Sequence, residues 1–271
     1  MSRKTNALDG RVCYEEGVEF IKLFPEKDTK KSDVPVLVIF GWGALSLEQY
    51  KNPLLSLSKT RIILGINTVF GTSSLSLFSD TYKQKAYLLL GELASHGITK
   101  VDAIACSEGA IIATLAGSIN PEMFRNIIFV NPAGFGAPRS TGEFIFAYVK
   151  ELFSGIKEAL IQRTFWKKTF RVCNGTIRRF LAHPFRSLRE ASGIAGADVR
   201  QHLVFLKKNG IRLSLLLAKE DSLFPPEKVR SDIEDGLFVE IRESGGRHSS
   251  FIFNETDTVI EMLSVLENQK E

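Results

Sequence analysis

Short apolar runs alternate along this chain with longer stretches in which apolar residues recur every three or four positions. The short runs predict buried strands and the periodic stretches predict helices. Pro53 interrupts one of these helices. The expected strands are 11–14 and 18–24, which form a pair, followed by 34–40, 61–66, 101–105, 126–130, 213–217 and 238–242. The expected helices are 45–57, 80–96, 108–119, 226–235 and 257–268.

The alternation breaks over residues 138–200, where the pattern predicts several helices and no strand. Repeated strand–helix units are typical of a mostly parallel sheet with helices on both faces. We therefore expect an α/β fold with a central sheet of about eight strands. Residues 1–137 and 201–271 are expected to form its core, and residues 138–200 a helical cap inserted after the sixth strand.

The composition narrows the class of protein. The 271 residues are 44% hydrophobic and 24% charged, as in ordinary globular domains, which excludes disordered, collagen-like and coiled-coil chains. The net charge of +4 is too small and too mixed to indicate a nucleic-acid partner. The pattern shows no membrane-spanning run and no secretory signal, and the three cysteines favour neither a disulfide framework nor a zinc site. We expect a cytoplasmic protein.

The expected cap differs from the rest of the chain in charge. It contains twelve basic and five acidic residues, a net charge of +7, and many aromatic residues. Such a segment can be a helical cap whose aromatic side chains point inward while its charges are solvated. It can also contact an anionic membrane surface or a fatty, acidic ligand, with Lys167, Lys168 and Arg171 as candidate contacts.

Ser107 stands at the junction between an expected strand and an expected helix. A serine at so sharp a turn adopts a positive φ, and bulky residues two positions to either side would collide with the strand and the helix. Ala105 and Gly109 occupy these two positions. Cys106 lacks such small neighbours, so we assign it a structural role. A serine before a helix is also a common N-cap, so Ser107 alone does not decide the function.

A nucleophilic serine needs a histidine base and an acid that orients it. His248 follows the last strand and precedes the last helix, which places it at the same edge of the sheet as Ser107. Asp221 follows the strand 213–217 at that edge, and the adjacent Glu220 is the rival acid. The other histidines fit a helix end, packing or the surface better: His96, His183 and His202.

The segment Phe40-Gly41-Trp42-Gly43 follows the expected strand 34–40. Stabilising an oxyanion requires two backbone N–H groups directed at one point. We assign these to Glu108 and Trp42, with Gly41 and Gly43 letting the backbone approach the substrate and the Trp42 indole forming a wall of the substrate site. A plain strand-to-helix turn also explains the two glycines. The Glu108 carboxylate is expected to face solvent or an arginine of the cap.

The chain resembles the α/β-hydrolase superfamily in five segments. Residues 105–109 resemble its nucleophile elbow Gly-x-Ser-x-Gly, with Ala in the first position. Residues 40–43 resemble its His-Gly oxyanion segment, with Phe in place of His. Residues 71–73 (Gly-Thr-Ser) resemble the tail of its Gly-x-Ser segment. Residues 221–225 resemble its acid segment and residues 248–255 its histidine segment, and the order Ser, Asp, His is that of the family.

The resemblance implies a serine hydrolase with Ser107 as nucleophile, His248 as base and Asp221 as orienting acid. We expect it to act on a small-molecule ester or thioester without a metal or other cofactor. The aromatic residues of the expected cap suggest apolar acyl or alcohol groups in that substrate. A serine nucleophile argues against epoxide or haloalkane chemistry. Two alternatives stay open. One is a catalytically weak ligand-binding or scaffold protein with this fold. The other is a different acyl chemistry, such as C–C hydrolysis or acyl transfer.

Overall fold

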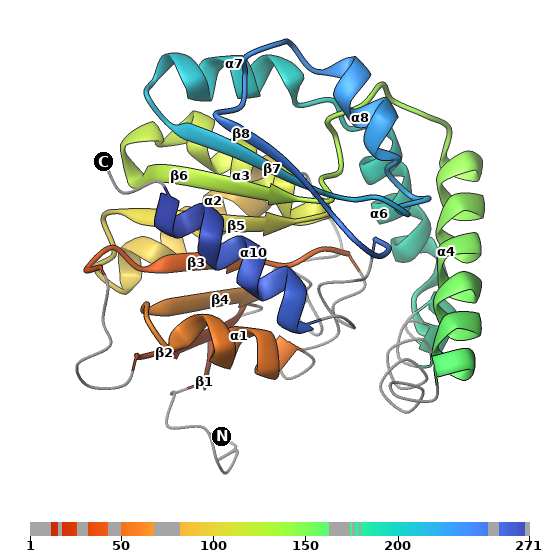
Figure 1. The fold of residues 1–271 in the computed structure, drawn as a ribbon, viewed down its shortest axis with the longest axis horizontal. Helices are drawn as coiled ribbons and strands as arrows, with labels where there is room; N and C mark the ends of the chain where they lie inside the picture. The colour runs from red at the N-terminus through yellow and green to blue at the C-terminus, as the bar shows by residue number, and fades with distance from the viewer. Residues whose placement is uncertain are drawn as a thin grey trace.

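The computed structural model describes residues 12–15, 18–25, 32–42, 50–67, 82–162, 174, 177–178, 180–248 and 255–268. In this part of the chain a single sheet has the strand order β1-β2-β4-β3-β5-β6-β7-β8 (Figure 1). The pairs β1–β2 and β2–β4 are antiparallel and all others are parallel. The expected α/β fold with about eight strands is confirmed. The strands are β1 (Val12–Glu15), β2 (Val18–Leu23), β3 (Val36–Ile39), β4 (Ile63–Asn67), β5 (Val101–Cys106), β6 (Phe124–Val130), β7 (Arg212–Ala218) and β8 (Glu240–Ser244).

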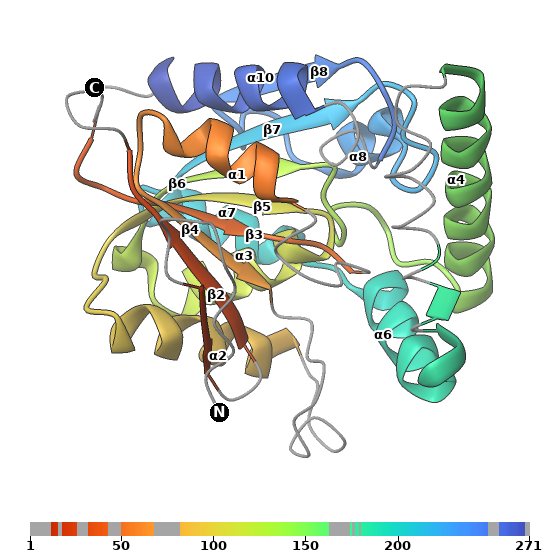
Figure 2. The same ribbon diagram turned by 90° about the horizontal axis from the view of Figure 1, so that it is seen from below.

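Helices cover both faces of the sheet. In Figures 1 and 2, α1 and α10 lie together on one face, and α2 and α3 lie together on the other, where α7 also packs against α3. The helices of the described part are α1 (Lys51–Ser58), α2 (Tyr82–Ser95), α3 (Glu108–Ile119), α4 (Thr141–Gln162), α6 (Pro184–Gly196), α7 (Arg200–Lys208), α8 (Pro226–Asp232) and α10 (Glu255–Asn268), with a 3₁₀ turn η3 (Pro121–Met123).

The two faces of the sheet form two hydrophobic cores. Along β3, Leu37 and Ile39 enter the core beneath α2 and α3, whereas Val36 and Val38 enter the core beneath α1 and α10. All four side chains are fully buried. Because both faces are covered, the central strands are apolar at nearly every position, which is why they could be predicted from short apolar runs.

Residues 45–49 of the expected first helix lie outside the described part of the chain. Helix α1 starts at Lys51, so Pro53 lies in its first turn, where backbone N–H groups have no acceptor within the helix. The last strand starts at Glu240, two residues later than the sequence predicts. Phe238, just before it, is buried and packs edge-on against Phe129. Helix α7 was not predicted. Its apolar contacts are Leu203 and Leu206, which are buried on a short helix directly after the expected cap.

Helices α4 and α6 connect β6 to β7 and lie beyond the carboxyl ends of the parallel strands (Figure 2). They pack against each other. The division of the chain into a core and a separate cap at residues 138–200 stays a prediction. Residues 163–173, which include Lys167, Lys168 and Arg171, lie outside the described part of the chain. Across the described helices, none has the length and apolar character needed to cross a membrane.

Candidate active site

Ser107 lies in the tight turn that joins β5 to α3 and has φ 52° and ψ −120°. This positive φ is unusual for a residue with a side chain, and it turns the serine side chain out of the strand. The helix that follows starts directly against β3, because a Cβ atom on Gly109 would lie 2.4 Å from the carbonyl oxygen of Ile39. Only glycine fits there without a shift of backbone. The Ser107 N–H donates to Val130 O at 3.0 Å, and the Ala133 N–H donates to Ser107 O at 3.1 Å.

The structure brings Ser107, His248 and Asp221 into one hydrogen-bonded line. His248 Nε2 lies 2.9 Å from Ser107 Oγ, and His248 Nδ1 lies 2.7 Å from Asp221 Oδ2. The other carboxylate oxygen, Oδ1, accepts the backbone N–H groups of Leu223 and Phe224, each at 2.8 Å. With Nδ1–H donating to Asp221, Nε2 is left to accept the serine hydroxyl proton. This arrangement can activate a serine oxygen.

The alternative acid, Glu220, and the other three histidines lie outside the hydrogen-bonded line of Ser107, His248 and Asp221. Glu220 has a largely exposed side chain, 3.8 Å from Arg247. His96 stacks on Phe20 and contacts Glu92 O at the end of α2. His183 directly precedes α6. His202 lies on α7 and its Nδ1 contacts Ser118 Oγ.

The pKa of His248 is raised above its usual value of 6.5. Burial of the imidazole works in the opposite direction and lowers this pKa, as does the positive charge of Arg139. The charge of Asp221, its hydrogen bond to the imidazole and the charge of Glu151 outweigh these two effects. The imidazole is therefore a stronger base than an isolated histidine.

Two residues that sequence reasoning missed hold the histidine loop. Glu151 of α4 is buried. Its Oε1 accepts the backbone N–H of His248 at 3.1 Å, and its Oε2 accepts the Ser222 hydroxyl at 2.5 Å. Asn131 follows β6 with φ 46°, donates from Nδ2 to His248 O at 3.1 Å and accepts the Ala218 N–H at 2.7 Å. Asparagine tolerates this left-handed conformation, so an Asn directly after a strand was an available signal. No local pattern marked Glu151.

The segment after β3 lies against the nucleophile. A Cβ atom on Gly41 would lie 2.7 Å from Ser107 Cβ, so its backbone touches the serine. Trp42 is partly buried, and its indole Nε1–H donates to Glu190 Oε2 on α6 at 2.7 Å. Arg186 Nε donates to the other oxygen of Glu190 at 3.1 Å. An α6 carboxylate therefore fixes the indole orientation. Gly43 and the segment 71–73 lie outside the described residues.

Five aromatic side chains form a continuous series of ring contacts that ends at the His248 imidazole. The Trp42 ring lies 5.8 Å from Phe144, 4.9 Å from Tyr148 and 5.1 Å from Phe180. Phe144 in turn lies 6.3 Å from Phe224, whose ring is 5.3 Å from the His248 imidazole. We call these five side chains, Trp42, Phe144, Tyr148, Phe180 and Phe224, the aromatic cluster. It extends from the segment beside Ser107 to His248.

The expectation for the Glu108 side chain was wrong. Its carboxylate faces neither solvent nor a cap arginine, but is fully buried and accepts a hydrogen bond from Lys85 Nζ of α2 at 2.7 Å. The Lys85 ammonium also lies 5.3 Å from the Tyr82 ring centroid. Burial, followed by the charges of Glu108 and Glu190, raises the pKa of Tyr82, so its hydroxyl stays neutral. The Lys85 charge offsets the negative charge of Glu108 directly after the nucleophile.

Phe40 and Cys106 are packing residues. Phe40 is buried and stacks on Tyr50 with ring centroids 3.9 Å apart, so an aromatic contact fills the position where the resembled family has histidine. Cys106 is buried, and burial raises the pKa of its thiol to about 12. A thiol with so high a pKa is a poor nucleophile, in agreement with a structural role.

Comparisons with known proteins identify the fold. No family model and no curated protein matches the chain. Among solved structures, MGS-M2, an alpha/beta hydrolase enzyme from a Medee basin deep-sea metagenome library, matches with a TM-score of 0.69 at 18% identity, over 95% of this chain and 97% of that one. A bromoperoxidase from Bacillus anthracis matches with a TM-score of 0.70 at 15% identity, over 92% and 95%. This chain has the α/β-hydrolase fold.

An enol-lactonase from Burkholderia xenovorans also matches, with a TM-score of 0.67 at 13% identity over 92% of this chain and 96% of that one. The α/β-hydrolase fold therefore spans nearly the whole chain, as the five resembling segments imply. Identities this low establish the fold, and the chemistry must be argued from the site. In this chain the fold brings the ends of β3, β5 and β7 and the segment after β8 together at one edge.

Proposed function

We propose that this protein is a serine hydrolase that cleaves a carboxylic ester or thioester through an acyl-enzyme intermediate. The observation that carries the proposal is the line from Ser107 Oγ through His248 to Asp221, with contacts of 2.9 Å and 2.7 Å. A helix N-cap serine needs no histidine, and a buried aspartate that orients an imidazole toward a serine oxygen has no evident packing role.

In the proposed reaction, His248 Nε2 takes the proton of Ser107 as the serine oxygen attacks the acyl carbonyl carbon. The backbone N–H groups of Trp42 and Glu108 stabilise the oxyanion that forms. The bond to the leaving oxygen or sulfur then breaks, and His248 returns the proton to the leaving group. Water, deprotonated by His248, attacks the acyl-enzyme and releases the acid and Ser107. Asp221 holds the imidazole and stabilises its charged form.

The aromatic cluster supports an apolar substrate. Phe144 is buried within it, whereas Trp42, Tyr148, Phe180 and Phe224 are partly exposed. Exposed aromatic surface binds acyl or alkyl chains by removing them from water. Gly41 supports the oxyanion assignment because its backbone touches Ser107. The substrate-binding role is assigned to Trp42, Gly41 and Gly43.

The decisive experiment is labelling with a fluorophosphonate probe, combined with hydrolysis of a panel of simple esters. The wild type should be labelled, and Ser107→Ala and His248→Ala should not be. Ser107→Ala should lower turnover by a factor on the order of 10⁶, and Asp221→Asn by about 10⁴. Ester cleavage that persists in Ser107→Ala would exclude the proposal. A folded wild type that is neither labelled nor active would favour a ligand-binding protein.

The partners follow from this function as proposals. The substrate is a small molecule, and the enzyme works in the cytoplasm without nucleic acid or cofactor. The membrane contact proposed for the basic, aromatic cap can be tested by vesicle sedimentation. Replacing Lys167, Lys168 and Arg171 with Gln should release the protein from anionic vesicles, and unchanged sedimentation would exclude these contacts.

A further inference from the structure

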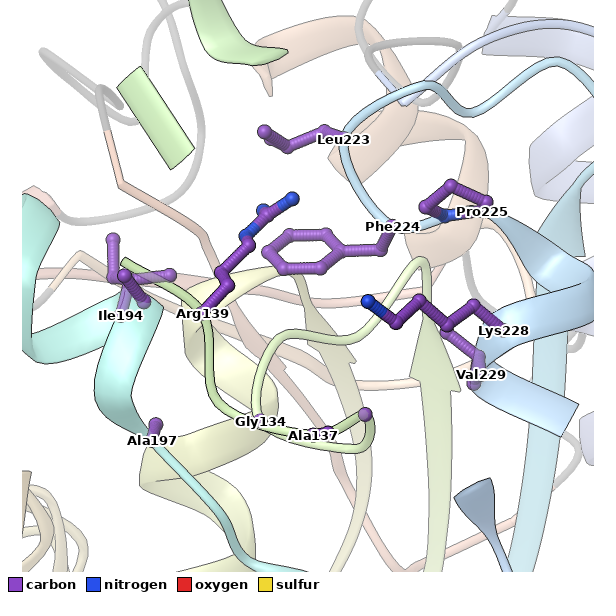
Figure 3. Close-up of a pocket in the computed structure, with 12 residues that line it drawn as sticks. Gly134, Ala137, Arg139, Ile194, Ala197, Leu223, Phe224, Pro225, Lys228 and Val229 are labelled. Carbon is purple, nitrogen blue, oxygen red and sulfur yellow. The ribbon is translucent and has the colours of Figure 1, made fainter. Parts of the chain in front are cut away.

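A cleft at the junction between α6 and the loop after β7 is lined by Arg139, whose guanidinium has a nitrogen without a hydrogen-bond partner in the described part of the chain. The cleft has a volume of about 40 Å³ and is lined by Arg139, Ile194, Phe224 and Lys228, among others. Figure 3 shows the Phe224 ring with the Arg139 guanidinium on one side of it and the Lys228 ammonium group on the other.

The Arg139 guanidinium is held between two rings. Its Cζ atom lies 4.9 Å from the Phe144 ring centroid and 5.0 Å from that of Phe224. Its Nη2 atom is buried and has no hydrogen-bond partner in the described part of the chain. A buried guanidinium nitrogen without a partner is unfavourable by an amount comparable to a lost hydrogen bond to a charged group, so its retention needs an explanation.

The acidic residues near Arg139 are engaged elsewhere. Asp221 binds His248 through Oδ2 and two backbone N–H groups through Oδ1. Glu143 accepts the backbone N–H and the hydroxyl of Ser140 through Oε2. Asp232 Oδ2 accepts the Ala137 N–H at 2.7 Å. None of the three forms an ion pair with Arg139 among the described contacts, although the charges of Asp221 and Glu143 act on its guanidinium. The Nη2 group therefore stays available to donate to an external anion.

The cleft is next to the proposed reaction centre. The Phe224 ring centroid lies 5.0 Å from Arg139 Cζ and 5.3 Å from the His248 ring centroid. The volume exceeds the 10–15 Å³ that a single water needs and suits a small terminal group, whereas a ring or an acyl chain would not fit. Arginine binds carboxylates through paired N–H groups, and Lys228 adds a second charge.

We propose that Arg139 and Lys228 form a subsite for a carboxylate carried by the substrate. The natural substrate is then an ester with an apolar middle, which lies along the aromatic cluster, and an anionic carboxylate at the end remote from the scissile bond. This proposal rests on the ester hydrolysis proposed above and names the substrate class of that same site.

The test compares half-esters with diesters of the same acid. Monomethyl and dimethyl adipate, suberate and sebacate are matched pairs in which only the half-ester keeps a carboxylate. Rates are measured above the acid limb of the pH profile, where His248 is neutral in every variant. The wild type should hydrolyse the best half-ester with a kcat/KM at least about 10-fold above its diester. Arg139→Gln should reduce that preference by about 10- to 100-fold, and Arg139→Lys should restore part of it.

Lys228→Gln keeps the test decisive if Arg139→Gln fails to fold, because Lys228 is exposed. It should reduce the preference less, by about 3-fold, in line with a solvent-screened charge. Arg178→Gln, an exposed arginine elsewhere in residues 138–200, is the control and should keep the wild-type preference. Equal activity on half-ester and diester, or equal loss on both in Arg139→Gln, would overturn the proposal.

Binding separates this proposal from the proposed function. Ser107→Ala should bind monomethyl suberate, detected by calorimetry, and Ser107→Ala/Arg139→Gln should bind it at least about 10-fold more weakly. If the wild type hydrolyses no ester but this difference is found, ester hydrolysis is wrong and the carboxylate subsite stands. If esters are hydrolysed without any carboxylate preference, the subsite is wrong and the hydrolase stands.

Discussion

Glu151 accepts a hydrogen bond from the backbone N–H of His248 at 3.1 Å, although the two residues are 97 positions apart. Its second oxygen accepts the hydroxyl of Ser222, which directly follows Asp221. One carboxylate of α4 thus connects the loop that carries the acid to the loop that carries the base. We assign Glu151 a positioning role, since it touches neither Ser107 nor the reacting atoms.

Substitutions at Glu151 should separate its charge from its hydrogen bonds. Glu151→Gln keeps an acceptor for His248 and removes the charge that raises the pKa of the imidazole, so the acid limb of kcat/KM should move to lower pH with little loss at the plateau. Glu151→Ala removes both, and its plateau should fall by about 10-fold or more. Initial rates across pH measure both. Identical pH profiles for Glu151→Gln and the wild type would contradict the effect of the Glu151 charge on His248, and an unchanged plateau in Glu151→Ala would contradict the positioning role.

The pH dependence of the wild type follows from the same group. His248 acts as a base only when neutral, and its pKa is raised above 6.5. As pH falls through this raised pKa the imidazole becomes protonated, so kcat/KM should decrease with an apparent pKa above 6.5. The profile of kcat/KM against pH, with a substrate that does not titrate in the same range, measures it. A limb at or below 6.5 would mean that burial outweighs the two carboxylates.

The sequence predicted what depends on local geometry and missed what depends on packing between distant elements. Small residues on both sides of Ser107 predict the turn because the constraint lies within five residues. The position of His248 after the last strand predicts its edge of the sheet. The Lys85 partner of Glu108 could not be predicted, since it depends on how α2 packs on α3. Glu151 was missed for the same reason, because only the placement of α4 brings it to His248.

Gly109 should tolerate no side chain. A Cβ atom there would lie 2.4 Å from the Ile39 carbonyl oxygen, so the backbone of α3 or β3 must shift. Gly109→Ala should reduce the free energy of unfolding by about 1–3 kcal/mol and also lower kcat/KM, because the shift displaces Ser107. Urea unfolding and ester hydrolysis measure the two effects.

Gly91→Ala is the matched control for Gly109→Ala. It lies within α2, has open space around its Cβ position, and should stabilise the protein by about 0.5–1 kcal/mol through helix propensity. A Gly109→Ala variant as stable and as active as Gly91→Ala would show that the close approach of α3 to β3 is unimportant.

The contributions of Lys85 and Glu108 to the free energy of unfolding should be strongly non-additive. Both side chains are almost fully buried, so removing one partner leaves an uncompensated charge in the core. Lys85→Met should therefore reduce the free energy of unfolding by about 3–5 kcal/mol, and Lys85→Met/Glu108→Gln should recover much of this loss. Urea unfolding of both single variants and the double variant completes the cycle.

An exposed ion pair is the control for the double-mutant cycle of Lys85 and Glu108. Arg230 and Glu243 form a 2.8 Å ion pair with side chains 44% and 34% exposed, so Arg230→Met should change the free energy of unfolding by no more than about 1 kcal/mol.

The same buried pair should affect catalysis. Lys85→Met should lower kcat/KM, because Glu108 would then carry an unbalanced negative charge beside the developing oxyanion. Additive unfolding free energies for Lys85 and Glu108 would instead mean that each residue acts through its own packing. An unchanged kcat/KM in Lys85→Met would mean that the ion pair does not protect the oxyanion.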